Sequence, residues 1–174
     1  MELSQITAMS ASAGIHIYLL WAYRFIRICL GVVFVISGWS KLMDPQSFVF
    51  IIQAYGLLAD SLLLPVALGL SLLELLAGIA LIIDIQYALA TIAGLIVLFM
   101  LILGYGLWLG LDVDCGCFAA DDPEGQAYHG LRPALYRDAA MLAGIIYLYF
   151  WRWQRSYKPI LFSDLYKKFE QTRR

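Results

Sequence analysis

The stretch Tyr87–Leu109, YALATIAGLIVLFMLILGYGLWL, decides the class of fold because it contains no charged side chain from end to end. A helix needs about 20 mainly apolar residues to cross the hydrocarbon core of a bilayer, which is roughly 30 Å thick. Of the 174 residues in the chain, 62% are hydrophobic and 14% are charged, whereas soluble domains average about 25% charged residues. The composition indicates an integral membrane protein in a lipid membrane, and the net charge of −1 gives no reason to expect a nucleic-acid partner.

Three further apolar stretches are long enough to cross a bilayer, and they lie at about residues 20–43, 61–83 and 131–153. Between the first two, Gln46–Leu58 is apolar but too short to span, so we predict a short helix that lies on or dips into the membrane interface. The predicted fold is an all-α integral membrane protein, a four-transmembrane-helix bundle over residues 17–153. Residues 1–16 are small and polar, and we predict that they are loosely ordered.

The basic residues predict the orientation of the bundle. Seven of the twelve lysines and arginines lie between Arg152 and Arg174. Residues 154–174 therefore form a basic tail, which we expect to be an amphipathic helix on the cytoplasmic membrane surface. Four spans return the chain to its starting side, so the N-terminus is also expected in the cytoplasm. The connections after residues 43 and 109 would then face the oxidising side of a prokaryotic inner membrane.

The connection between the third and fourth spans contains Cys115-Gly116-Cys117. A disulfide across one residue closes a very small ring, which is strained and easily reduced. A disulfide that closes so short a loop would add little to the stability of the fold. The pair therefore indicates a redox-active dithiol, and the second interpretation is a site for a soft metal ion such as Cu(I) or Hg(II).

The acidic residues Asp112 and Asp114 flank this pair and disfavour a thiolate, so a reactive thiolate needs a cation nearby. The candidates on the outer side are Lys41, Arg132 and Arg137.

Charges inside the spans mark further candidate site residues. Glu74 lies in the middle of the second span, and an intramembrane carboxylate points to a functional site. Its partner would be Lys41, Arg137 or a proton, and the alternative is a helix-packing hydrogen bond from a protonated Glu74. Similarly, Arg137 with Asp138 could be a buried ion pair that only fixes the bundle. Cys29, near the inner end of the first span, is interpreted as a core thiol.

One face of the first span combines small and charged residues. Arg27, Gly31, Phe34, Gly38 and Lys41 follow one another at alternating steps of four and three, which places them on a single helical face. We expect this stripe to face a neighbouring helix, because glycine allows close approach.

Four segments of the sequence together resemble the MauE branch of the DoxX-like membrane proteins. They are RICLGVVFVISGWSKLMDPQSF (27–48), LELLAGIALI (73–82), LDVDCGCFA (111–119) and LYRDAAML (135–142). The family has glycine where this chain has Ala119, which leaves the dithiol in place. The family is associated with methylamine utilisation, where such a protein acts with a thioredoxin-like partner in disulfide formation on the dehydrogenase. The resemblance implies roles for a set of site residues: Lys41, Asp44, Glu74, Cys115, Cys117 and Arg137.

Two functions follow as hypotheses. The first is a membrane thiol–disulfide oxidoreductase that exchanges disulfides with a thioredoxin-like soluble protein on the outer face, with a quinone as candidate electron acceptor. The alternative is a carrier for a soft metal ion or sulfur species, with Cys115 and Cys117 as metal ligands and the intramembrane charges along its path. A purely docking role is least favoured, because docking does not need a dithiol.

Overall fold

The computed structural model describes residues 2–110 and 131–155, with side chains from residue 18 onward. Five helices make up this part of the chain: α1 (Glu2–Met43), α2 (Pro45–Ala54), α3 (Asp60–Ile83), α4 (Ala88–Leu109) and α6 (Leu131–Arg155). The described residues contain no β-strand, so the all-α prediction is confirmed. Cys115, Cys117 and the predicted amphipathic tail lie outside the described residues.

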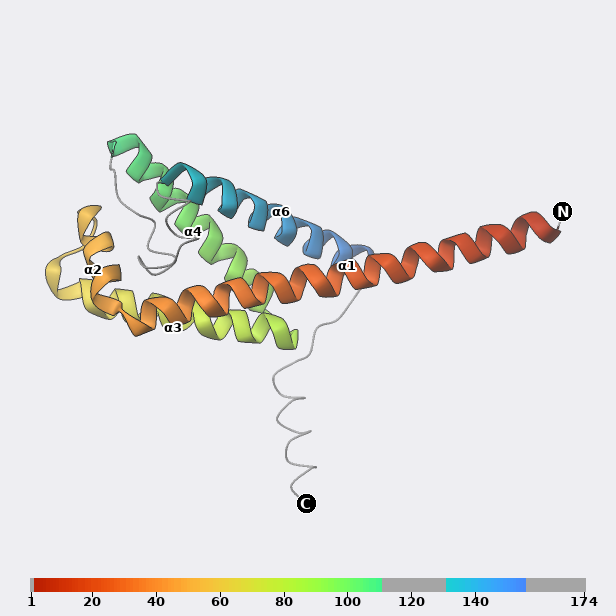
Figure 1. The fold of residues 1–174 in the computed structure, drawn as a ribbon, viewed down its shortest axis with the longest axis horizontal. Coiled ribbons are helices and arrows are strands. Elements are labelled where there is room, and N and C mark those ends of the chain that lie inside the picture. The colour runs from red at the N-terminus through yellow and green to blue at the C-terminus, as the bar shows by residue number, and fades with distance from the viewer. Residues whose placement is uncertain (1, 111–130, 156–174) are drawn as a thin grey trace, which may run out of the picture.

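The four long helices reverse direction one after another along the chain (Figure 1). α1 packs along α3, α4 packs along α6, and α2 packs beside α3. The bundle therefore has two ends. At the end that we call the α2 end, α1 and α4 finish while α3 and α6 begin. At the opposite end α3 and α6 finish and α4 begins.

Three helices are long and apolar enough to cross a membrane: Tyr18–Met43, Asp60–Ile83 and Ala88–Leu109. They agree with the predicted spans to within two residues. α6 has the predicted start but is not among the three. Its sequence holds five charged residues as well as several tyrosines and tryptophans, which lower its apolarity.

The start of α1 differs from the prediction, because the helix begins at Glu2 and includes the residues expected to be loosely ordered. Residues 2–43 contain no proline, and their alanine, leucine, methionine and glutamine residues are strong helix formers. With a rise of about 1.5 Å per residue, a helix of this length measures about 63 Å, roughly twice the bilayer core. α1 accordingly extends past the rest of the bundle (Figure 1).

α2 forms where a short helix was predicted, but its bounds are narrower. Asp44 caps its start by accepting a hydrogen bond from the Ser47 amide at 3.2 Å. The helix ends at Ala54 rather than Leu58, because Gly56 adopts a left-handed conformation with φ of 63°. Its place at a membrane interface stays a prediction.

Glycine brings α1 and α3 into close contact. A Cβ atom on Gly38 would lie 2.6 Å from the Leu75 amide nitrogen, and one on Gly78 would lie 2.8 Å from the Gly31 carbonyl oxygen. These contacts confirm that the predicted stripe on the first span faces a neighbouring helix. The two helices are thereby held in one register, which positions the charged side chains at either end of the stripe.

Candidate functional site

A buried ion pair joins α1 to the middle of α3. The Lys41 Nζ lies 2.6 Å from Glu74 Oε2, and the two side chains are 3% and 4% exposed. The Ser37 hydroxyl donates to Glu74 Oε1 at 3.1 Å, one turn before Lys41 on the same face of α1. Of the three partners considered for Glu74, Lys41 is the one that pairs with it.

Aromatic rings from two more helices cover the same ammonium group. The Lys41 Nζ lies 5.0 Å from the ring centroid of Phe48 on α2 and 4.9 Å from that of Phe99 on α4. A cation over a ring face is attracted by the ring quadrupole, more strongly where water is excluded. One ammonium on α1 thus contacts side chains of α2, α3 and α4 inside the bundle.

A second ion pair comes from α6. The Nε and Nη2 atoms of Arg137 lie 3.2 and 3.0 Å from Asp138 Oδ1. Asp138 is 3% exposed and Arg137 is 30% exposed. The Arg137–Asp138 pair that the sequence suggested therefore forms. Glu74 pairs with Lys41 instead of Arg137.

One cavity lies between the two pairs, and its polar lining consists of Ser37, Glu74, Arg137 and Asp138. Together with Lys41, which pairs with Glu74, these residues form what we call the central cluster. The cavity measures about 20 Å³, which is room for about one water molecule. Its remaining lining is apolar: Val33, Phe34, Phe99 and Met141.

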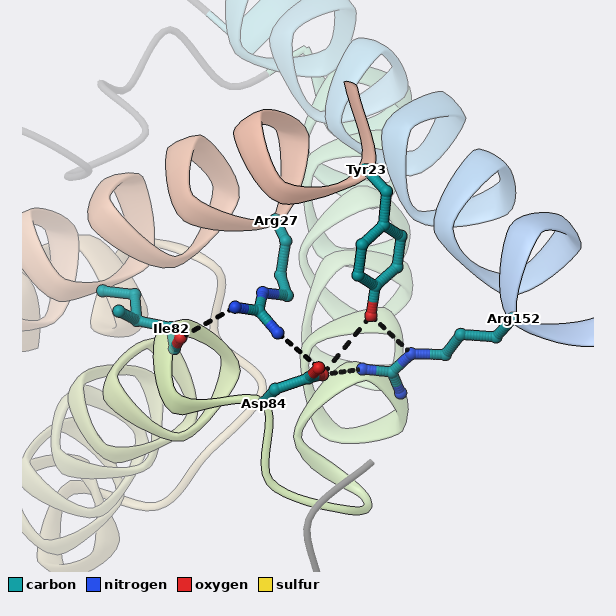
Figure 2. Close-up of polar contacts among 5 residues, drawn as sticks. All are labelled: Tyr23, Arg27, Ile82, Asp84 and Arg152. Carbon is teal, nitrogen blue, oxygen red and sulfur yellow. Dashed lines mark hydrogen bonds and ion pairs between the residues drawn. The ribbon is translucent and has the colours of Figure 1, made fainter. Parts of the chain in front are cut away.

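A second buried cluster, which the sequence reasoning missed, lies at the other end of the bundle (Figure 2). Asp84 forms ion pairs with Arg27 of α1 and with Arg152 of α6, the latter at 2.5 Å. The Tyr23 hydroxyl donates to Asp84 Oδ1 at 3.3 Å and accepts from Arg152 Nε at 3.0 Å. The Tyr23 ring stacks on Trp151 with centroids 4.2 Å apart. We call Tyr23, Arg27, Asp84 and Arg152 the arginine-end cluster.

The local structure at the end of α3 explains how Asp84 reaches both arginines. Asp84 caps α3 in a left-handed conformation with φ of 69° and ψ of 38°. This turns its side chain back under the bundle, where α1 and α6 pass (Figure 2). The sequence signal was present, because one acidic and several basic residues flank predicted span ends. However, the sequence reasoning counted Arg152 only with the basic residues at the end of the chain and did not consider Asp84 as its partner.

An apolar layer separates the two clusters. Its side chains come from α3, α4 and α6, and each is at most 1% exposed: Leu81, Leu89, Ile92, Ile96, Ile145 and Leu148. Leu30 and Phe34 of α1 complete the layer. The central cluster is therefore separated from the arginine end by close-packed hydrocarbon.

Asp44 and Cys29 lie apart from both clusters. Asp44 is exposed at the start of α2. Hydrogen bonds from the side chain and amide of Ser47 lower the pKa of Asp44 below its usual value. Cys29 is exposed on α1, so the expectation of a core thiol was wrong. The reason is rotation, because the face of α1 that packs on α3 carries the glycine stripe and turns Cys29 outward.

Residues 111–130, which contain Cys115 and Cys117, connect α4 to α6 in the sequence, and we call them the dithiol segment. The helix ends that flank this segment lie together at the α2 end. Leu103 of α4, Leu131 and Ala134 of α6, and Tyr55 at the end of α2 form one buried apolar cluster. The chain thus leaves α4 and returns at α6 in neighbouring positions. The cysteines between them lie outside the described residues.

Comparison with known proteins agrees with this arrangement. The family model for the methylamine utilisation protein MauE matches residues 18–151, which include most of the helical bundle, the central cluster and the arginine-end cluster except Arg152. No curated protein and no solved structure matches the chain.

Proposed function

The chain belongs to the family of the methylamine utilisation protein MauE, and from this premise we propose that it is a membrane thiol–disulfide oxidoreductase acting in methylamine utilisation through Cys115 and Cys117. As a member of this family with helices long enough to cross a bilayer, it is a multi-pass membrane protein. A thioredoxin-like soluble protein is the proposed partner, and the CxC spacing favours an easily reduced disulfide.

The observation that carries the proposal is the position of the flanking helix ends. Leu131 packs against the last turns of α4 and against Tyr55. The described chain therefore breaks off after α4 and resumes at α6 in neighbouring positions at the α2 end, and Cys115 and Cys117 lie between these two points in the sequence. The opposite end carries four arginines among the described residues: Arg24, Arg27, Arg152 and Arg155. The α2 end carries three basic residues, Lys41, Arg132 and Arg137, whereas the sequence that continues after α6 holds five more lysines and arginines. Because basic residues are enriched on the cytoplasmic side of membrane proteins, this bias supports an outward-facing dithiol.

This orientation requires α6 to be a fourth membrane span, and two features support that role. α6 has 25 residues and so measures about 37 Å at 1.5 Å per residue. Two of its arginines pair with buried carboxylates, Arg137 with Asp138 and Arg152 with Asp84. Its outward side chains are mostly apolar or aromatic: Tyr136, Ile146, Tyr149, Phe150 and Trp153. Paired charges inside the bundle are the form in which membrane helices tolerate them.

The proposed reaction is a disulfide exchange that conserves atoms and electrons. A thiolate of the partner attacks one sulfur of the Cys115–Cys117 disulfide, and a mixed disulfide forms while the other cysteine leaves as a thiolate and takes up a proton. The second partner thiolate then breaks the mixed disulfide. The partner leaves with a disulfide, and the chain retains two thiols and two electrons.

The cations named from the sequence differ in their availability to a thiolate. Lys41 is 3% exposed and engaged by Glu74, so we assign it to holding the bundle together. Arg137 is 30% exposed and Arg132 is exposed in the first turn of α6. Because Arg137 is engaged by Asp138, we propose that Arg132 supplies the positive charge that the acidic residues beside the cysteines require.

A quinone head group does not fit the central cavity, which has room for about one water molecule. We therefore derive no step through a quinone. The arrangement favours a relay between proteins, in which a second protein carrying a disulfide reoxidises Cys115 and Cys117 by the same exchange chemistry.

The test is replacement of Cys115 and Cys117 by serine in cells, with Cys29→Ser as the matched control. Thiol alkylation of the thioredoxin-like partner should reveal accumulation of its reduced form in the double variant and no change in the control. An unchanged partner would contradict the proposal. The carrier alternative needs the apolar layer to open, and tighter Cu(I) or Hg(II) binding than in the double serine variant would revive it.

A further inference from the structure

The arginine end carries more positive charge than its carboxylate neutralises. In the arginine-end cluster, Asp84 pairs with both Arg27 and Arg152. Arg24 lies three residues before Arg27, so the two side chains are neighbours on the surface of α1. Arg24 is exposed and has no ion-pair partner among the described residues. Three arginines thus share one carboxylate, and an excess of positive charge remains at this end of the bundle.

The guanidinium group of Arg152 is held in place but only partly used. Its Nε donates to the Tyr23 hydroxyl at 3.0 Å, and its Nη2 donates to Asp84 Oδ1 at 2.5 Å. The third nitrogen, Nη1, points away from both partners (Figure 2) and has no hydrogen-bond partner among the described residues. The side chain is 13% exposed. A guanidinium nitrogen in such a position needs an acceptor from outside these residues.

Exposed aromatic side chains mark the level of the membrane surface around this cluster. The apolar span of α3 ends at Ile83, directly before Asp84. Tryptophan and tyrosine gather where a membrane protein meets the lipid head groups. Four aromatic side chains are exposed within three residues of Arg24, Asp84 or Arg152: Trp21, Phe25, Tyr87 and Trp153. The arginine-end cluster therefore lies at the level of the lipid head groups.

We propose that the arginine end binds the phosphate group of an anionic phospholipid. Nη1 of Arg152 is the donor to the phosphate, and Arg24 is a second positive charge at the same level of the membrane. Guanidinium groups suit phosphate oxygens in geometry and charge. The excess positive charge favours a head group with a net negative charge over a zwitterionic one, whose own cation it repels. The inference is independent of the proposed dithiol chemistry.

The other members of the cluster orient Arg152 for this contact. Arg27 donates to the Ile82 carbonyl oxygen at 3.3 Å and pairs with Asp84, so it holds the carboxylate that in turn holds Arg152. The ring of Tyr23 is fixed by stacking on Trp151, with centroids 4.2 Å apart. A side chain that is already held in this way loses little conformational freedom when a ligand binds.

The experiment measures lipid binding to the full-length protein in detergent by native mass spectrometry. The probes are phosphatidylglycerol and phosphatidylcholine with the same acyl chains. The wild type should bind phosphatidylglycerol about fivefold more tightly than phosphatidylcholine, or better. Arg152→Gln should lower the affinity for phosphatidylglycerol about tenfold, because it removes a charged donor. Arg24→Gln should lower it about fivefold, and this change of an exposed side chain leaves the ion pairs of Asp84 intact.

Arg132→Gln is the matched control, because it removes the same charge from an exposed position at the opposite end of the bundle. Twenty residues of α6 separate it from Arg152, which is about 30 Å, so screening should keep its effect within about twofold. If Arg24→Gln or Arg152→Gln binds phosphatidylglycerol as tightly as Arg132→Gln, the proposed site is wrong. Equal binding of the two lipids by the wild type would also overturn it.

Inorganic phosphate is the third probe, because it offers the same oxygen acceptors without acyl chains. Added at millimolar concentration, it should bind far more weakly than phosphatidylglycerol, since the aromatic residues place the site at the lipid surface. If inorganic phosphate binds the wild type as tightly as the lipid and this binding is lost in Arg24→Gln, the site takes a soluble phosphate and the lipid assignment is wrong.

Discussion

The Lys41–Glu74 pair permits a quantitative test of the fold, because both side chains are almost fully buried. At 2.6 Å and an effective dielectric constant of about 20, the gross Coulomb attraction is about 6 kcal/mol. Much of this is offset by removing both charges from water. Breaking such a pair by removing one partner typically costs about 3–5 kcal/mol, because the other charge stays buried alone.

We therefore expect Glu74→Leu and Lys41→Met each to lower the free energy of unfolding by about 3–5 kcal/mol. The combined variant leaves no buried charge at these positions, and both replacements resemble the originals in volume. It should be less destabilised than either single variant. A remaining cost of about 1–3 kcal/mol is expected from the Ser37 hydroxyl, which loses its acceptor.

The measurement is equilibrium unfolding in mixed detergent micelles, followed by circular dichroism, for the two single variants and the combined one. Asp60→Leu, at an exposed carboxylate on the same helix, is the matched control and should change stability by less than about 1 kcal/mol. If Glu74→Leu costs no more than this control, or if the combined variant is the least stable, a buried charged pair is not present.

Three further perturbations test other parts of the structure. Gly78→Ala should lower the free energy of unfolding by about 1–3 kcal/mol in the same assay, because its Cβ would lie 2.8 Å from a carbonyl oxygen of α1. The control is Gly69→Ala, where no atom lies within 4 Å of the new Cβ. It should leave the free energy of unfolding unchanged or raise it by up to about 1 kcal/mol. Asp84→Ala leaves two largely buried guanidinium groups without their carboxylate and should cost about 3–5 kcal/mol, with faster proteolysis at the arginine end; stability equal to wild type would contradict the cluster. The lowered pKa of Asp44 means that its cap stabilises α2 above the ordinary carboxyl pKa and is lost as pH falls through the depressed value. Limited proteolysis of α2 should therefore accelerate in acid in the wild type, while Asp44→Ala should be cleaved faster at neutral pH and show little further acid dependence.

Local features of the sequence predicted much of the fold. Long, mainly apolar runs identified three spans to within two residues, because the bilayer thickness determines how many apolar residues a helix needs. The alternating steps of four and three in Arg27–Lys41 predicted the packed face of α1, and the glycine contacts with α3 confirm it. The early start of α1 and the exposure of Cys29 were missed. The reason for the second is that the glycine face, rather than the hydrophobicity of Cys29, decides which residues of α1 turn inward.

The sequence by itself determined the membrane class, the positions of three apolar spans and the presence of a Cys-Gly-Cys motif after the third, because these depend on composition and spacing over one turn or one span. The tertiary structure decided which charges meet. Glu74 had two cationic candidates, and the α1–α3 register placed Lys41 against it. Asp84 pairs with two arginines that are far from it and from each other in the chain. Such pairs depend on helix rotation, register and the turn at the end of α3, and no local pattern encodes these distances.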